Sequence, residues 1–242
     1  MKSISKKVAA FLFVLTSIFY YQNAQSQILI SLLLGDKLNS DKLEFGIDGG
    51  LSRSNLNGID GTKGLNNFHL GFYFDFKLNN HWYLNTGVRV KSNAGATNLE
   101  IYQVGDSELD TVLVEGHVTR KIGYFYVPVH AKYRFAKQFY GMAGFQVGLR
   151  GRARDLFYNT IYEKDDVEFT HDIGDEVTRL DFGFSGGFGY KFKGTGMNLG
   201  ITYYYGIVDI MKSSNINSTN SVFYLYVCIP VGAGKKNDAK TK

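Results

Sequence analysis

The stretch Ile122–Arg152, IGYFYVPVHAKYRFAKQFYGMAGFQVGLRGR, decides the fold of this chain. From Phe125 to Phe135, apolar residues occupy every second position, and tyrosine, proline or charged residues fill the positions between. A period of two predicts a β-strand, and a second such arm follows the turn at Ala136-Lys137. A soluble β-sandwich also alternates, but it would have to point these charges into its core. A transmembrane barrel instead turns the apolar face to lipid and the charged face to a polar lumen.

Residues 1–26 have the features of a secretory signal peptide. Three lysines within the first seven residues precede the apolar stretch Val8–Tyr21, and Ala24-Gln25-Ser26 supplies small residues before a cleavage site at Gln27. The apolar stretch is shorter than the roughly 20 residues that a spanning helix needs. We therefore expect export rather than a helical membrane anchor.

Composition agrees with an exported barrel and excludes a nucleic-acid-binding surface. Removal of the signal takes three of the 27 basic residues and no acid, which leaves 24 against 22. The single cysteine, Cys228, excludes an internal disulfide. Aromatic residues make up 15% of the chain, with 28 glycines and two prolines. This mixture is typical of barrels, where aromatic side chains lie at the membrane interfaces and glycine makes room inside.

Alternation predicts eight strands, each long enough for the roughly 9–11 residues of a tilted membrane strand. Their expected ranges are Lys42–Arg53, Asn67–Leu78, His81–Lys91, the two arms of the hairpin above, Thr178–Phe192, Met197–Asp209 and Ser221–Val231. The barrel then spans residues 42–231. Residues 27–41 form a periplasmic segment, whose periodicity does not decide between a short helix and an extra strand. Residues 232–242 form a basic periplasmic tail.

Short and long connections alternate strictly between these strands. The short ones are Asn79-Asn80, Ala136-Lys137 and Lys193–Gly196, and the long ones are Ser54–Asn66, Ser92–Lys121, Gly151–Val177 and Ile210–Asn220. In outer-membrane barrels short turns face the periplasm and long loops face outside. An even number of strands then places both chain ends in the periplasm.

The loops Ser92–Lys121 and Gly151–Val177 are acidic, and both still alternate in part, which suggests that the barrel wall continues above the membrane. Their carboxylates could bridge divalent cations at the cell surface. Since no EF-hand spacing is present, we favour a solubilising loop surface and predict no metal site.

Charged residues at inward positions are the candidate site. They are Glu44, Asp48, His69, Asp75, Lys77, Arg89, Lys91, His130, Lys132, Arg134, Arg150, Arg179, Asp181 and Lys191. Side chains fill an eight-stranded barrel, and enclosed charges should pair, so the main interpretation is a salt-bridge network. Eight Lys or Arg stand against four acids. That excess keeps a second interpretation open, a narrow anion-favouring channel or a phosphate contact.

Catalysis is not predicted, and no cofactor is expected. His69, His130 and Ser185 lie at inward positions of separate strands, without a motif such as G-x-S-x-G. The stretch Phe184-Ser185-Gly186-Gly187 is better explained by small residues that leave space for inward tyrosines.

Several stretches resemble the PorT-like, or "porin family", outer-membrane β-barrel domain of Bacteroidota. They are FGIDGGLSRSNL (45–56), HLGFYFDFKLNNHWYLNTGVRVKSNAG (69–95), YVP (126–128), KYRF (132–135), LDFGFSGGFGYKF (180–192) and LGITYYYGIVDI (199–210). The resemblance covers Leu43 to Val231 and implies an eight-stranded outer-membrane barrel. The namesake belongs to the type IX secretion system. Unlike barrels that end on an aromatic residue, this chain continues past Val231 to Lys242.

From these residues and the resemblance we expect a barrel with a structural or surface-binding role. The alternatives are a component of an envelope complex for secretion or uptake, or a narrow pore. The expected partners are outer-membrane lipid and lipopolysaccharide, the barrel-assembly machinery and an envelope protein.

Overall fold

The computed structural model describes residues 39–114, 116–161, 165–212 and 217–231. The predicted signal peptide, most of the 27–41 segment and the basic tail after Val231 lie outside these residues. In chain order the elements are β1 (Leu43–Asn57), β2 (Lys63–Lys77), β3 (Trp82–Leu99), α3 (Ser107–Leu113), β4 (His117–Arg134), β5 (Phe139–Ile161), β6 (Asp165–Asp172), β7 (Leu180–Lys191), β8 (Asn198–Gly206) and β9 (Thr219–Pro230).

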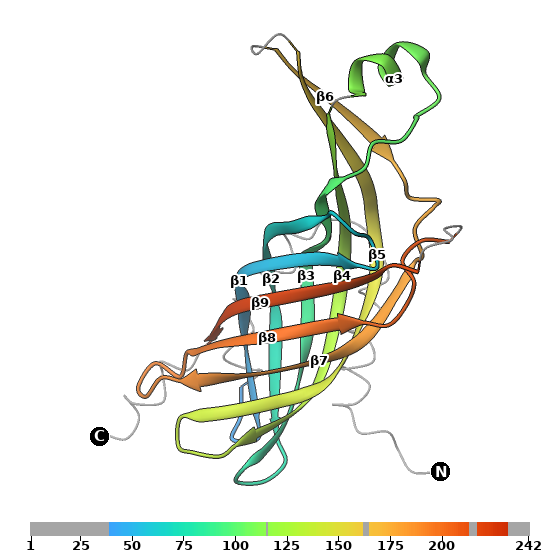
Figure 1. Cartoon of the computed structure of the whole chain (residues 1–242). Coiled ribbons are helices and arrows are strands. Elements are labelled where there is room, and N and C mark those ends of the chain that lie inside the picture. The colour runs from blue at the N-terminus through green and yellow to red at the C-terminus, as the bar shows by residue number, and fades with distance from the viewer. Residues whose placement is uncertain (1–38, 115, 162–164, 213–216, 232–242) are drawn as a thin grey trace. The chain divides into compact units, whose positions relative to one another are not determined.

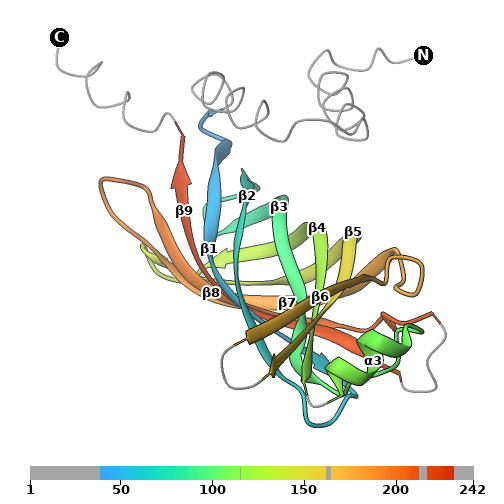
Figure 2. The same cartoon turned by 90° about the horizontal axis from the view of Figure 1, so that it is seen from above.

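Eight of these strands close into one antiparallel ring. The order runs β4-β3-β2-β1-β9-β8-β7-β5, and β4 pairs with β5 to complete the circle. Strand β6 stands outside the ring and pairs with the upper part of β5. The predicted eight-stranded up-and-down barrel is therefore confirmed, and Figures 1 and 2 show its curved wall from two directions.

Burial alternates along the ring as the period of two requires. In β9, Val222, Tyr224 and Tyr226 are buried, whereas Phe223 and Leu225 between them are each 42% exposed. Large apolar side chains are exposed in the same way on every strand of the ring, which leaves an apolar outer surface. So large an apolar surface indicates contact with lipid rather than water.

The three short connections lie where the sequence predicts them, and the expected continuation of the wall is present in the loops 92–121 and 151–177. Strand β3 continues to Leu99, β4 begins at His117, and β5 reaches Ile161 before it turns back into β6. The wall therefore extends well past the expected membrane strands. Figure 1 shows this β5–β6 hairpin and α3 at the same end of the ring. In the part of the chain that the structure describes, no helix is long and apolar enough to cross a membrane.

Candidate functional site: the filled lumen and its cap

A buried charge cluster lies at the middle of the lumen. Arg89 Nε donates to Asp48 Oδ2 at 3.2 Å, and its Nη1 donates to Gln146 Oε1 at 2.9 Å. The guanidinium carbon lies 4.1 Å from the centre of the Tyr224 ring. His69 Nε2 is 3.5 Å from the second Asp48 oxygen, and both residues are almost fully buried. The cluster joins β1, β2, β3, β5 and β9 across the lumen.

Two further ion pairs lie towards the end of the short connections. Lys132 Nζ donates to Asp75 Oδ2 at 2.6 Å and lies 4.0 Å above the Tyr140 ring. Lys191 donates to Glu44, whose other oxygen accepts from the Tyr73 hydroxyl at 3.0 Å. Each cation therefore meets a carboxylate from a distant strand, as a stable buried charge requires.

Asp181 is held by neutral donors. It is fully buried and accepts from the hydroxyls of Tyr126 at 2.7 Å and Tyr204 at 2.8 Å, and from the Asn220 amide at 2.9 Å. Three donors from different strands satisfy the carboxylate without a basic partner. Asp181 thus links β4, β8 and β9 to its own strand, β7.

The inward Ser–His pair does form. His130 Nε2 lies 2.6 Å from Ser185 Oγ, and its Nδ1 lies 3.3 Å from Asn85 Oδ1. Asn85 in turn donates to Asp75 at 2.7 Å. Although a nucleophile, base and orienting group follow this order in hydrolases, His130 and Ser185 are enclosed by the wall. A small cavity of about 20 Å³ lies close to them, on the other side of Asn85.

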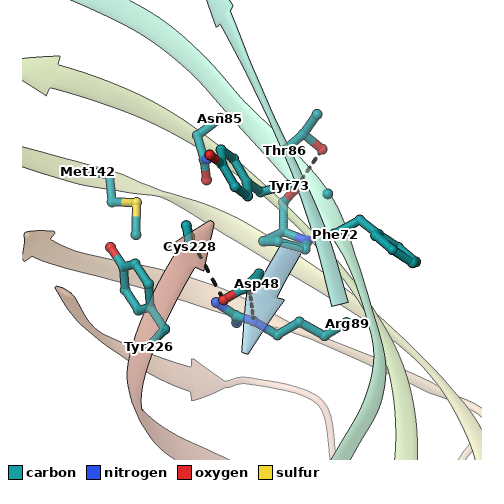
Figure 3. Close-up of a pocket in the computed structure, with 11 residues that line it drawn as sticks. Asp48, Phe72, Tyr73, Asn85, Thr86, Arg89, Met142, Tyr226 and Cys228 are labelled. Carbon is teal, nitrogen blue, oxygen red and sulfur yellow. Dashed lines mark hydrogen bonds and ion pairs between the residues drawn. The ribbon is translucent and has the colours of Figure 1, made fainter. Parts of the chain in front are cut away.

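That cavity lies between Asp48, Asn85, Arg89, Tyr226 and Cys228 (Figure 3). In the figure, Asp48 and Arg89 point toward one another, with Cys228 beside them. A volume of this size with several polar walls accommodates about one water molecule. The large side chains around this cavity, including Tyr73, Arg89, Met142 and Tyr226, are buried and occupy the lumen at this level.

Three predicted lumen residues lie elsewhere. Lys77 is exposed at the end of β2, and Arg179 is exposed just before β7 begins. Lys91 is also exposed, because a shift in register between Leu70 and Gly71 turns it outward, where its Nζ lies 4.1 Å over the Phe68 ring. Arg134 stacks on Tyr83 at 4.6 Å, and Arg150 is half-buried near the upper end of the lumen. The excess of lumen cations is therefore smaller than the sequence predicts.

A folded cap, formed by residues 100–114 with α3 and by the upper parts of β4, β5 and β6, covers the other end. Leu113, Val118, Phe157 and Ile173 are buried in it and are continuous with the lumen tyrosines. Asp106 caps α3 by accepting from the amides of Glu108 and Leu109.

Arg120, Asp155 and Tyr102 form the polar centre of the cap. Arg120 donates twice to Asp155, at 2.9 and 2.6 Å, and the Tyr102 hydroxyl donates to the same carboxylate at 2.8 Å. Burial and the adjacent Asp155 raise the pKa of Tyr102. Asp155 is fully buried, so our prediction of a solvated acidic surface is wrong at this residue. The continued alternation of the loop was the available signal, because it puts Arg120 and Asp155 at inward positions.

Tyr102→Phe should loosen the cap without unfolding the barrel. The change removes one charge-assisted hydrogen bond, which contributes about 1.5–3 kcal/mol, while Arg120 still neutralises Asp155. Amide hydrogen exchange should accelerate by at least tenfold in residues 100–116 and stay unchanged in β8 and β9. Equal acceleration in all strands would contradict a locally stabilised cap. Tyr133→Phe, on the outer face, is the matched control.

The closed ring, the apolar outer surface and the filled lumen together define an integral β-barrel of the outer-membrane class. The chain belongs to the outer membrane protein β-barrel domain family, whose model matches residues 22–212. No curated protein matches the sequence.

Three solved structures that match the chain all have TM-scores below 0.5. Ail, the attachment invasion locus protein of Yersinia pestis, is 13% identical, with a TM-score of 0.43 over 79% of this chain and 99% of Ail. Neisserial surface protein A is 12% identical, with a TM-score of 0.38 over 76% of this chain and 96% of its own. OprG of Pseudomonas aeruginosa is 13% identical, with a TM-score of 0.34 over 78% of this chain and 93% of OprG.

Proposed function

We propose that this protein is a non-conducting outer-membrane barrel that presents its folded cap at the cell surface. One observation carries the proposal: Arg89, Lys132 and Lys191 each pair with a carboxylate across the lumen, and the small cavity beside Asp48 and Arg89 has room for about one water. In this orientation the cap is outside, and the short turns and both chain ends are periplasmic. The barrel-assembly machinery would insert the chain, and lipid and lipopolysaccharide would surround it. We propose no enzymatic activity.

Planar bilayer recordings of the refolded full-length protein should show no conductance above the empty bilayer. The physical reason is that Asp48, Arg89 and the lumen tyrosines are buried against one another across the lumen. A known open porin refolded in the same detergent is the positive control. Stable ion currents from this protein, larger for anions than for cations, would instead support the narrow anion-favouring pore.

A second role, as a component of an envelope complex, is favoured by the outer edge of strand β6. Strand β6 is the last strand in the pairing order, so one of its edges has no neighbouring strand among the described residues. A partner can add a strand to such an edge. The resemblance to PorT-like proteins of Bacteroidota extends this proposal to secretion. Purification of the tagged protein after crosslinking in its own host would test it, since a stoichiometric envelope partner is expected only for the complex.

A further inference from the structure

We propose that the outer face of β3, β4 and β5, at the level of the cap's polar centre and just below it, binds the phosphate groups of lipopolysaccharide through Lys91, Lys121, Arg152 and Arg154. The inference rests on the proposed orientation, in which the cap end of the barrel reaches the outer leaflet.

Register places three of these cations together on the outer face. Lys121 of β4 lies directly opposite Arg154 of β5. The residues that flank them, Arg120, Ile122, Ala153 and Asp155, are all buried, so Lys121 and Arg154 themselves project outward. An extra residue in β5 between Arg150 and Ala153 turns Arg152 to the same face, where it is exposed.

These cations lack a carboxylate partner. Among the described residues, no acidic oxygen lies within 4 Å of the charged atoms of Lys91, Lys121, Arg152 or Arg154. Asp172 pairs with Arg154 in the register, but its Oδ1 accepts from the Gly174 amide at 2.8 Å. Like charges directly opposite in an antiparallel pair are destabilising. A bound anion between Lys121 and Arg154 would remove this repulsion.

Along the barrel axis, the cations lie at the level expected for lipid headgroups. Phe125, Leu149 and Leu180 lie side by side in the register immediately below them, and Leu149 and Leu180 are 43% and 48% exposed. Such side chains require the hydrocarbon layer. Lys91 lies at the boundary, with its ammonium group over the exposed Phe68 ring, as expected for a long side chain that reaches for the headgroups.

The densest group of outward cations at this level lies on β3, β4 and β5, although Arg53 of β1, Lys63 of β2 and Arg179 before β7 are also exposed at the same end. Strands β8 and β9 contain no lysine or arginine, and the single lysine of β7, Lys191, pairs with Glu44 in the lumen. Arg and Lys form strong charge-assisted hydrogen bonds with phosphate oxygens. The anionic lipid of the outer leaflet with clustered phosphates is lipopolysaccharide, whose phosphorylated lipid A fits a compact group of cations.

The test uses the refolded protein in detergent micelles with added lipid A. The triple variant Lys121→Gln, Arg152→Gln, Arg154→Gln is compared with Lys77→Gln, Lys137→Gln, Lys193→Gln, which removes three exposed cations from the short-turn end. Intact barrel formation of each variant is first checked by the mobility shift on boiling. Since basic residues near an anionic membrane surface each contribute about fivefold to affinity, the first variant should bind bisphosphorylated lipid A roughly a hundredfold more weakly. The second should bind like the wild type.

Three outcomes would overturn the assignment. They are equal binding by the wild type and the first variant, equal binding of dephosphorylated lipid A by the wild type, or preference for phosphatidylglycerol over lipid A. Loss of binding in the second variant instead would place the lipid A site at the short-turn end and would also overturn the assignment. A conducting channel in the bilayer recordings would overturn the proposed function but leave the lipid result unchanged.

Discussion

Replacement of Arg89 by methionine should destabilise the barrel by about 3–5 kcal/mol, because it removes one partner of a buried ion pair and leaves the other charged. Asp48 would retain His69 at 3.5 Å as its remaining basic neighbour, and Gln146 would lose the donor to its Oε1. Methionine keeps most of the side-chain length, so the loss arises from charge and hydrogen bonding more than from volume. Urea unfolding in detergent micelles, followed by tryptophan fluorescence of Trp82, would measure the change.

The exposed Lys77→Met supplies the matched control and should change stability by less than about 0.5 kcal/mol. The double variant Asp48→Leu, Arg89→Met is more informative. If the single change is costly because an unpaired charge stays buried, removal of both charges should recover part of the loss. A double variant that loses the sum of the two single losses would show that Asp48 and Arg89 act independently, contrary to the geometry.

The strands of the barrel could be predicted because the residues of each strand show the alternation without reference to other strands. Alternation of lipid-facing and lumen-facing side chains is a local pattern, and in β9 Phe223, Leu225 and Ile229 express it without interruption. The short turns are also local, since Asn79-Asn80 and Lys193–Gly196 contain residues that favour tight turns. Strand count and closure follow from these two signals, and the structure confirms both.

The partners inside the lumen could not be predicted, because they depend on the register of the closed ring. Asp48 meets Arg89 across 41 residues of sequence, Asp75 meets Lys132 across 57, and Glu44 meets Lys191 across 147. Alternation shows that such side chains point inward. It does not show which of them lie at the same level along the barrel axis. That depends on the shear of the barrel, a property of all eight pairings together.

Local irregularities account for the residues that the sequence misplaces. Lys91 would point inward if β3 alternated without interruption, and the shift at Leu70 and Gly71 reverses it. Asp155 falls in what reads as an acidic loop, yet the extended strand β5 carries it into the cap beside Arg120. A bulge leaves almost no signal in the sequence, because it is selected by pairing with the neighbouring strand. The longer β5 did leave a signal, since the alternation continues into the loop.

Besides the buried Asp48–Arg89 pair, the stability of the barrel depends on tyrosine rings that cover glycines on neighbouring strands. Tyr126 lies opposite Gly148, and the same arrangement occurs between Tyr140 and Gly189 and between Tyr226 and Gly200. A β-carbon added at Gly148 would lie 2.4 Å from Cε1 of Tyr126, well inside contact distance. The ring cannot move freely, because its hydroxyl donates to buried Asp181 at 2.7 Å.

Gly148→Ala should therefore destabilise the barrel by about 2.5–6 kcal/mol, the sum of overpacking and a lost hydrogen bond to a charged group. The matched control is Gly151→Ala in the same strand, where the added carbon would meet its nearest atom at 3.5 Å and the site is exposed. The mobility shift on boiling, measured after incubation at increasing temperature, should disappear at much lower temperature for Gly148→Ala than for Gly151→Ala. Tyr126→Leu in the Gly148→Ala background should cost less than the two changes apart, because the steric conflict is then gone. Equal losses for the two alanine variants would mean that the packing of Tyr126 on Gly148 contributes nothing particular, and that the lumen tolerates rearrangement at this level.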